Sequence, residues 1–164
     1  MTIDPRQFRN ALGCFATGVT VVTAQAAGRP AIGITANSFS SVSLDPPLVL
    51  WCLDKKSDTF PVFEAASLFA INILREADQE ISSRLARRGQ HELNGLPLKT
   101  GKTGLPLLED ALALFECEVE SRHDAGDHII LVGRVVAFDY VVNGGAASGG
   151  PLIYYRGDYR SVTG

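Results

Sequence analysis

The sequence has no basic excess, no apolar run of membrane length and no clustered cysteines. Its 15 Lys and Arg are outnumbered by 18 Asp and Glu, and the net charge of −3 argues against a nucleic-acid partner, which needs cations to hold phosphates. No apolar stretch approaches the roughly 20 residues of a membrane-spanning helix, and the first ten residues lack the apolar segment of a signal peptide. We therefore expect no nucleic-acid partner, no membrane partner and a cytoplasmic location.

The cysteines and histidines form no metal-binding pattern. Cys14, Cys52 and Cys117 are odd in number, lie far apart and include no CxxC spacing, so we expect reduced thiols in the core. His123 and His128 are close in sequence, but no third ligand is placed convincingly beside them. We therefore expect no metal site.

The chain does contain enough apolar residues for one core. Of its 164 residues 46% are hydrophobic, and no repeat or linker divides them, so we expect a single domain over residues 1–164. Helices are predicted after the Asp4-Pro5 start, over 60–66 with Ser57 as the cap, and around Ile81 and Leu85 with Gly89 at the end. Apolar and β-branched runs predict strands at 19–23, 31–35, 48–53, 68–74, 115–119, 128–142 and 152–156.

About seven strands with three short helices that do not alternate with them argue against a doubly wound α/β fold. We expect a mainly β protein, an antiparallel barrel with short peripheral helices. Residues 48–53 are apolar at odd and even positions alike, and therefore on both faces of a strand, which predicts a central strand covered on both faces.

Local patterns add further expectations outside the long strands. Residues 37–41 predict a polar loop, and the segment 45–47, Asp-Pro-Pro, predicts a break in strand pairing. The glycines and prolines of 89–106 predict a long loop, suited to a lid. Between Phe115 and Glu120 apolar and acidic residues alternate, so we expect Glu116, Glu118 and Glu120 to face solvent.

Most common catalytic patterns are poorly supported. The glycine cluster 144–150 is followed by a strand and not by the helix that a dinucleotide-binding loop requires. Ser40 and Ser41 lack a G-x-S-x-G elbow, and the apolar neighbours of Cys52 suggest a buried thiol. Two polar segments remain, 35–41 and 52–59, and each follows a strand as binding loops do. Hydroxyl and amide groups of the first suit a planar heterocycle, and the cations and helix start of the second suit a phosphate, although a solvated turn and a capped helix explain them equally well.

Three motifs carry a resemblance to a known family. They are TGVTVVT at 17–23, GITANSFSSVSLDPP at 33–47 and GDH at 126–128. With these motifs the chain resembles the short-chain NAD(P)H:flavin oxidoreductases, in order from about Phe8 to Tyr155. The resemblance implies a split β-barrel of the flavin-reductase type and a homodimer with the flavin site near the subunit interface.

The resemblance also implies a flavin-binding set in the two polar segments. Residues 35–38 would line the isoalloxazine edge, 40–41 would lie toward the ribityl chain, and part of the second segment would take the phosphate through Lys55, Ser57 and Thr59. The whole set is Thr35, Ala36, Asn37, Ser38, Ser40, Ser41, Cys52, Leu53, Asp54, Lys55, Ser57 and Thr59. His128 is expected to orient the nicotinamide, with Tyr155 on the same side.

The implied activity is transfer of hydride from NADH or NADPH to FMN or FAD, with NADH preferred. Family members often supply reduced flavin to a separate monooxygenase component, so we expect such a partner. Two other readings stay open: a flavin-binding protein without catalysis on the same barrel, and an oxidase with a phosphate pocket at Arg84, Arg87 and Arg88. Leu85 stands where many relatives carry phenylalanine, which leaves the stacking of the second ligand open at that position.

Overall fold

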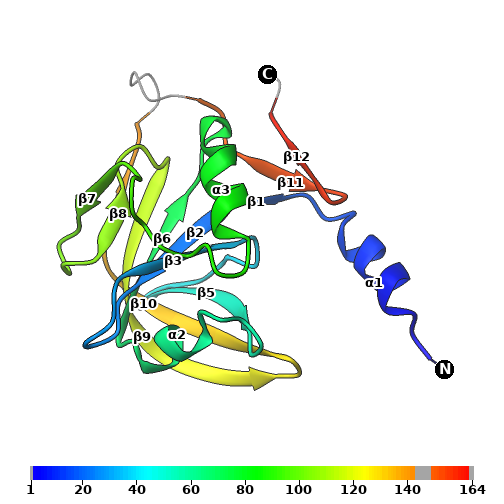
Figure 1. Ribbon diagram of the computed structural model, residues 1–164, viewed down its shortest axis with the longest axis horizontal. Helices are drawn as coiled ribbons and strands as arrows, with labels where there is room; N and C mark the ends of the chain where they lie inside the picture. The colour runs from blue at the N-terminus through cyan, green and yellow to red at the C-terminus, as the bar shows by residue number, and fades with distance from the viewer. Residues whose placement is uncertain (1, 143–148, 163–164) are drawn as a thin grey trace.

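The computed structural model describes residues 2–142 and 149–162, and it is mainly β as expected (Figure 1). Seven antiparallel strands form the main sheet, in the spatial order β3-β2-β6-β9-β10-β5-β4. Their bounds are β2 Thr20–Ala24, β3 Ile32–Ala36, β4 Ser40–Leu44, β5 Pro47–Asp54, β6 Leu68–Ile73, β9 Ala113–Ala125 and β10 His128–Tyr140.

The sheet curls so that its two edges come close together. The edge strands β3 and β4 are consecutive in the chain, and only residues 37–39 link them. Four Cα steps from Ala36 to Ser40 span at most about 14 Å. The sheet must therefore bend into a barrel, which stays open because β3 and β4 do not pair with each other in the part of the chain that is described.

Two small sheets and three short helices surround this barrel in the described part of the chain. The strands β1 Thr17–Gly18, β11 Ile153–Tyr155 and β12 Asp158–Arg160 form a second sheet, and β7 Leu98–Thr100 pairs with β8 Pro106–Leu108. The helices are α1 Pro5–Leu12, α2 Phe60–Ala65 and α3 Gln79–Leu85, the last preceded by the 3₁₀ turn η1 Glu76–Asp78. Strand β12 had no signal in the sequence reading.

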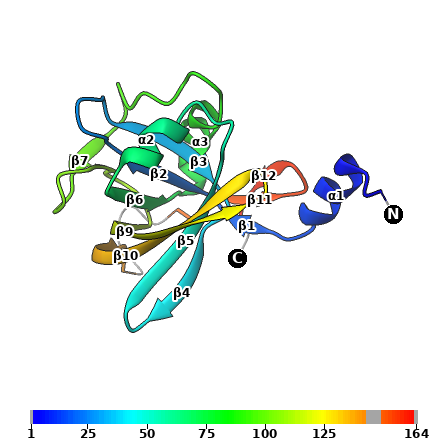
Figure 2. The same ribbon diagram turned by 90° about the horizontal axis from the view of Figure 1, so that it is seen from below.

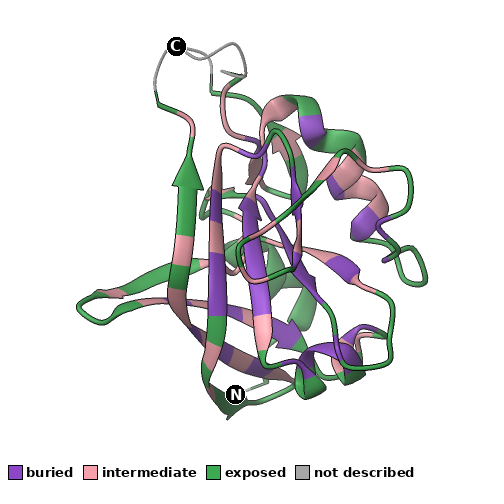
Figure 3. Ribbon diagram, turned by 90° about the vertical axis from the view of Figure 1, so that its left-hand side faces the viewer, coloured by how far each residue is buried: buried purple, intermediate pink, exposed green. Residues whose placement is uncertain are grey.

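Two clusters of buried side chains stabilise the barrel. Figure 3 shows the buried residues along the strands of the sheet and in the helix α3 that packs on it. In the first cluster, Trp51 packs edge-to-face against Phe63 and Phe69, with ring centroids 4.9 and 6.1 Å apart. In the second, Leu85 of α3 and Leu93 are buried against the sheet. Gly133 marks a β-bulge in β10, where a Cβ would overlap the Phe69 ring, so only glycine fits at this position.

Two expectations about the strands around residues 37–54 are wrong. Residues 48–53 do not form a central strand covered on both faces: β5 lies next to the edge, and its side chains alternate between buried and half-buried. Residues 40–44 are not loop but the edge strand β4, and the Asp45-Pro46 turn joins β4 to β5 without ending the pairing. Apolar residues at both odd and even positions of 48–53 did not mean burial on both faces, because a barrel strand can turn its second apolar face toward a cleft.

The segment 89–106 is not a free loop or lid. It contains β7, and Leu93 and Leu105 along it are buried in the second cluster. The expected C-cap at Gly89 is also displaced: α3 ends at Leu85 with Ala86 as its cap, and Gly89 takes a positive φ of 75° in the following turn. Residues 144–148 of the predicted glycine cluster 144–150 lie outside the described residues.

Local expectations at the helices and cysteines need smaller corrections. The first helix starts as predicted, with the Asp4 carboxylate accepting the Gln7 N–H at 2.7 Å, but no residue of α1 is buried. The N-cap of α2 is Thr59, not Ser57. All three cysteines are free thiols, yet only Cys117 is buried, where burial raises its pKa to about 12, while Cys14 is exposed.

Glu116 is buried, contrary to the alternation that placed it in solvent. Its carboxylate accepts the backbone N–H groups of Lys102 and Thr103 at 2.9 and 2.7 Å and also bonds the Thr103 hydroxyl. It thereby holds the tip of the β7–β8 hairpin. Burial raises the pKa of Glu116, but the bonds from Thr103 and Lys102 outweigh burial, and the net pKa lies below its ordinary value.

We expect Glu116 to stabilise the fold only while it is ionised. Because its pKa is lower in the folded chain than in the unfolded chain, this stabilisation is complete above the unfolded value near 4.3 and disappears as pH falls through the lower folded value. Glu116→Gln should lower the free energy of unfolding at neutral pH by about 1–3 kcal/mol and weaken its decline in acid. Urea unfolding between pH 7 and pH 3 measures both effects, with the exposed Glu118→Gln as the control. Parallel pH curves for wild type and Glu116→Gln would contradict this role.

Candidate active site

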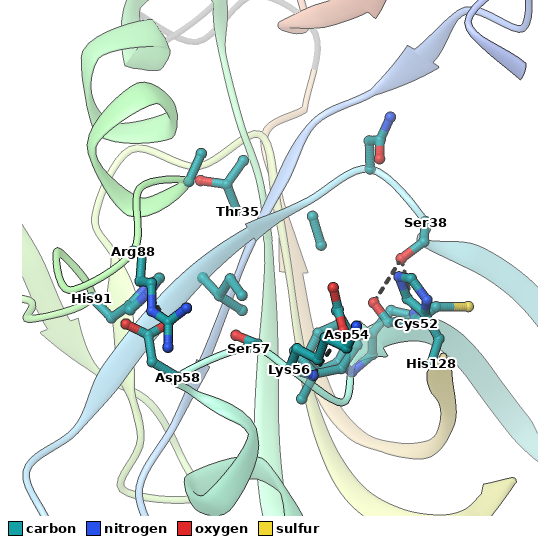
Figure 4. A pocket seen from close by; sticks show the side chains of 16 residues that line it. Thr35, Ser38, Cys52, Asp54, Lys56, Ser57, Asp58, Arg88, His91 and His128 are labelled. Carbon is teal, nitrogen blue, oxygen red and sulfur yellow. Dashed lines mark hydrogen bonds and ion pairs between the residues drawn. The ribbon is translucent and has the colours of Figure 1, made fainter. Parts of the chain in front are cut away.

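A cleft of about 430 Å³ opens at the seam of the barrel, between the end of β3 and the end of β5. The segment 34–38 forms one wall, the segment 51–58 forms the other, and the start of β10 and the turn after α3 complete it. Figure 4 places Arg88, His91 and Asp58 at one end and Ser38, Cys52 and His128 at the other. Nine residues of the predicted set lie in this lining: Thr35, Ala36, Asn37, Ser38, Cys52, Leu53, Asp54, Ser57 and His128.

The turn 54–58 is shaped by its own hydrogen bonds. The Asp54 carboxylate accepts the Lys56 N–H at 2.8 Å, and the Asp54 carbonyl accepts the Ser57 N–H at 3.0 Å. Ser57 Oγ in turn accepts the Thr59 N–H at 3.2 Å. Asx turns of this kind fix the backbone with local side chains. They bring Lys56 and Ser57 into the cleft at a defined place.

Lys55 and Lys56 are directed to different places, which sequence position alone did not reveal. Lys56 lines the cleft. The Lys55 ammonium instead donates to the Gly126 carbonyl at 3.0 Å and pairs with Asp124 at 2.8 Å, on the β9–β10 turn. Of the two neighbouring cations, Lys56 is the one available to an anion in the cleft.

Five predicted residues lie outside the cleft lining. Ser40 and Ser41 are exposed on β4, and Lys55 is held by the β9–β10 turn. Thr59 is buried beneath the turn and bonds the Ser57 hydroxyl at 2.8 Å. Tyr155 belongs to the small sheet, where the Arg156 guanidinium lies 5.3 Å from its ring centroid.

Polar side chains on the wall 34–38 form hydrogen bonds to other residues of the chain. The Thr35 hydroxyl donates to the Ser82 carbonyl at 2.7 Å, and the Asn37 amide donates to the Thr17 hydroxyl at 3.2 Å. Ser38 Oγ accepts the Cys52 N–H at 2.9 Å and so ties the wall 34–38 to β5. These three side chains therefore set the shape of the cleft wall.

The thiol of Cys52 is unsuited to nucleophilic attack. Burial raises its pKa above the ordinary value, and the opposing bond from Ser38 does not reverse this. A thiol needs ionisation to act as a nucleophile. Cys52 therefore stays neutral at physiological pH, in line with its expected exclusion as a catalytic group.

His128 stands at the rim of the cleft, at the first position of β10. It lies directly across the ladder from Asp54, and its Nδ1 is 2.7 Å from the carboxylate of Asp127. The bond from His128 and the charge of its ring lower the pKa of Asp127. With Nδ1–H donating to Asp127, the Nε2 atom of His128 is the ring nitrogen left to meet a ligand.

Three polar residues of the cleft are missing from the predicted flavin-binding set and from the alternatives: Lys56, Asp58 and His91, whereas Arg88 is expected only for the alternative oxidase. His91 Nε2 lies 2.8 Å from the Asp58 carboxylate, which also accepts the Gly89 N–H at 2.6 Å. Burial raises the pKa of Asp58, but the Gly89 bond and the charge of His91 outweigh it, and its pKa falls below the ordinary value. No spacing signal joins residue 58 to residues 88–91, because a β-strand and two helices separate them.

The grouping of metal-ligating side chains and the length of the helices bear on two further expectations. Among residues 2–142 and 149–162, no three His, Cys, Asp or Glu side chains are grouped as a metal site would require. The helices of the described chain are all too short or too polar to cross a bilayer. The cleft lining itself offers hydroxyls, backbone groups, cations and the His128 ring.

Comparison with known protein families identifies the family of this chain. Residues 12–163 match the family model described as the flavin reductase like domain. This chain belongs to the flavin reductase-like family. Its match covers nearly the whole length, and all three motifs of the sequence reading lie within it.

Several relatives show how the family is used. The chain is 38% identical over 160 residues to HsaB of Mycobacterium tuberculosis, the reductase subunit of a flavin-dependent monooxygenase, covering 98% of this chain and 83% of HsaB. It is 50% identical over 133 residues to SmoA of Agrobacterium fabrum, an FMN reductase that uses NADH, covering 81% of this chain and 75% of SmoA. Another relative, from Rhizobium meliloti, is 48% identical over 157 residues, and the chain spans only about half (48%) of its length.

Solved structures agree with the fold. The NADH:FAD oxidoreductase SgcE6 of Streptomyces globisporus, solved with NAD and FAD fragments, superposes with a TM-score of 0.88 at 31% identity, covering 99% of this chain and 97% of SgcE6. The split-barrel expectation is confirmed by this likeness, with the open seam noted above. By family the chain is an NAD(P)H:flavin oxidoreductase.

Proposed function

We propose that the cleft binds flavin as an exchangeable substrate, that the nicotinamide docks beside His128, and that the reduced flavin serves a separate monooxygenase component. The observation that carries this proposal is that the lining of the cleft holds two chemically different sets of groups. Lys56, Ser57 and Arg88 bring two cations and a hydroxyl to the lining, and the wall 34–38 with Cys52 and Leu53 brings neutral backbone and small side chains, so the relevant division is one of chemistry along the lining.

This division suits a flavin. A volume of about 430 Å³ falls within the usual range for small-molecule pockets, about 300–1,000 Å³. A terminal phosphate needs cations and hydroxyl donors, whereas the isoalloxazine ring needs a flat wall with backbone groups at its polar edge. The lining supplies both kinds of group, so the donor set fits a flavin.

In the proposed reaction the flavin receives a hydride from the nicotinamide once the rings are stacked. The chain's own groups contribute position and not acid–base chemistry. Ser38 holds β5 against the wall 34–38 and so keeps the ring wall rigid, since its Oγ bridges to the Cys52 backbone. His128, oriented by Asp127, presents Nε2 to the nicotinamide carboxamide.

We further propose that the working form is a homodimer. Helix α1 projects from the barrel in both views (Figures 1 and 2), and its apolar side chains Phe8 and Leu12 are 54% and 59% exposed. Phe15, just after the helix, is 78% exposed. Isolated helices of eight residues are marginal in water, so α1 gains stability from an apolar partner surface. A second copy of this chain is the occupant that the family resemblance implies.

Reduced flavin released from one protein can reach another by diffusion or during transient contact. HsaB is the reductase subunit of a monooxygenase, which supports a client of that kind for this chain.

The proposed function predicts NADH oxidation that depends on added flavin. The purified chain is mixed with NADH and a concentration series of FMN or FAD, and absorbance of the reduced nicotinamide is followed. Saturable oxidation with either flavin supports an exchangeable flavin and identifies the preferred one. Tight flavin binding with no NADH oxidation would instead indicate a flavin-binding protein without catalysis.

The same assay examines His128. His128→Ala should raise the KM for NADH about tenfold, because one hydrogen bond to the carboxamide is lost, while flavin affinity stays close to that of the wild type. His123→Ala is the matched control, since His123 lies on the same hairpin, bonds Ser121 and does not line the cleft. An unchanged KM for NADH in His128→Ala would rule out this role.

A further inference from the structure

The ring of His91 lies between two hydrogen-bond acceptors. Its Nδ1 is 3.2 Å from the Gly33 carbonyl oxygen, and its Nε2 is 2.8 Å from Oδ1 of Asp58. The residue is only 9% exposed, so water does not readily replace either partner. A neutral imidazole has one N–H and can donate to only one of them. The imidazolium, with a proton on each nitrogen, satisfies both.

Asp58 uses its second oxygen on the same segment. Its Oδ2 accepts the Gly89 N–H at 2.6 Å, so the carboxylate grips the turn after α3 at two points, Gly89 and His91. Arg88 is the residue just before the first of these points and lines the cleft. Asp58 itself belongs to the turn that carries Lys56 and Ser57. The Asp58–His91 pair therefore connects the turn 54–58 to the turn that carries Arg88, both of which line the cleft (Figure 4).

The backbone on the other side of His91 is fixed independently. The Gly33 N–H donates to the His91 carbonyl at 2.9 Å, and Ile32 forms an isolated β-bridge with Glu92. These backbone bonds do not depend on the charge of the ring. A change of protonation at His91 therefore acts on the Asp58 side of the ring and on the turn carrying Arg88, while the chain after residue 91 stays attached to β3.

Few other charges face this ring. The turn 54–58 brings Asp54 and Lys56 as well as Asp58, and the turn after α3 brings Arg88. Strand β3 has no titratable side chain. The Arg84 guanidinium of α3 donates to the backbone carbonyls of Glu92 and Asn94, so its charge lies on the loop that carries Glu92. His128 lies at the far end of the cleft (Figure 4).

We propose that the Asp58–His91 pair is a positioning device that holds Arg88 in the cleft, where it can meet a phosphate, and that it does so most firmly while the His91 ring carries both protons. The inference rests on the proposed function, because it takes the flavin phosphate as the anion that Arg88 meets. When the ring loses a proton, the neutral ring keeps the shorter Nε2–H bond to the Asp58 carboxylate, but this bond loses its ionic component and the Gly33 bond is lost. The grip on the turn weakens, Arg88 becomes less ordered, and affinity for a phosphorylated flavin falls.

The test measures dissociation constants of FMN and of riboflavin, which lacks the phosphate, by quenching of flavin fluorescence between pH 6 and pH 8. Wild type is compared with Asp58→Asn. In this variant the new amide carbonyl still accepts the Gly89 N–H, but its NH₂ group faces Nε2 of His91. That geometry suits the neutral ring, with the Nδ1 proton on Gly33, and disfavours the imidazolium. The contribution of the His91 ring to the pH dependence of FMN binding should therefore reverse in sign.

FMN changes charge itself in this range, since the second ionisation of a phosphate ester lies near pH 6. The ratio of the wild-type and Asp58→Asn dissociation constants cancels this effect. We expect that ratio to rise about tenfold from pH 6 to pH 8 for FMN, as when one ionic hydrogen bond loses the charge of its donor. It should stay nearly constant for riboflavin, which also serves as the check that the variant is folded. A constant ratio for FMN would overturn the inference.

Arg88→Ala separates positioning from a direct effect of the His91 charge. The ratio of the FMN dissociation constants of Arg88→Ala and of the double variant Asp58→Asn, Arg88→Ala is measured at pH 6 and pH 8. If the pair acts through Arg88, this ratio should change far less than tenfold between the two pH values. If the full change persists without Arg88, the positioning role is overturned.

A measurement without flavin keeps the inference distinct from the proposed function. In ¹H–¹⁵N spectra of the ligand-free chain at pH 6, the His91 ring should carry protons on both nitrogens in the wild type and on Nδ1 alone in Asp58→Asn. A neutral wild-type ring would overturn the inference whatever the flavin results. If the wild-type ring is doubly protonated but neither flavin binds, the proposed function fails, and with it the assignment of Arg88 to a flavin phosphate.

Discussion

Replacing Trp51 with alanine is expected to lower the free energy of unfolding by about 3–5 kcal/mol, the cost usual for a fully buried large aromatic side chain. Trp51 has no exposed surface and packs against Phe63 of α2 and Phe69 of β6, so it joins the helix to the sheet. A loss of this size is a large part of the total stability of a domain, about 5–15 kcal/mol. Urea unfolding followed by circular dichroism measures it.

Trp51→Phe is the matched control. The indole N–H of Trp51 meets no acceptor among the described residues, so a phenyl ring loses volume but no hydrogen bond. We expect Trp51→Phe to cost clearly less than Trp51→Ala. A cost below about 1 kcal/mol for Trp51→Ala would contradict the central place given to this ring.

The second large effect concerns the two neighbouring lysines. Lys56→Ala should weaken FMN binding by about tenfold to a hundredfold, because a charge-assisted bond to a phosphate contributes about 1.5–3 kcal/mol. Lys55→Ala should change it little, since the ammonium of Lys55 is held at the β9–β10 turn by Gly126 and Asp124. Riboflavin binding should be similar in both variants. Titration of flavin fluorescence provides these constants.

The resemblance by itself assigned the phosphate to Lys55, so the comparison discriminates sharply. Loss of FMN affinity in Lys55→Ala with none in Lys56→Ala would show that the turn 54–58 rearranges when flavin binds. Loss in neither variant would move the phosphate away from the turn 54–58, and the proposed placement of the flavin would then be wrong.

The strands with strong local signals were predictable. The hairpin of β2 and β3, the alternating strand β9 and the bulged strand β10 follow from β-branched runs, turn glycines and period-two patterns within a few residues. The start of α1 likewise follows from Asp4 and Pro5. These elements depend on interactions between near neighbours in sequence, which is why a single sequence reveals them.

Errors arose where the partner is distant in sequence. Glu116 looks solvent-exposed from its alternation, but the backbone amides of Lys102 and Thr103 reach it from another hairpin. Residues 89–106 look like a free loop, but Leu93 and Leu105 fill the space beneath α3. A pattern in one segment carries no information about which other segment will satisfy or bury it.

The sequence alone determined the family, the mainly β class and the two polar segments that face each other across the cleft, because motifs and strand patterns are local. Only the tertiary structure decided which side chains enter the cleft: Lys56 and not Lys55, and Asp58 with Arg88 and His91 beside Ser57. That choice depends on the curl of the sheet, which brings the ends of β3 and β5 together, and on hydrogen bonds between residues more than 30 positions apart, such as Asp58 to His91.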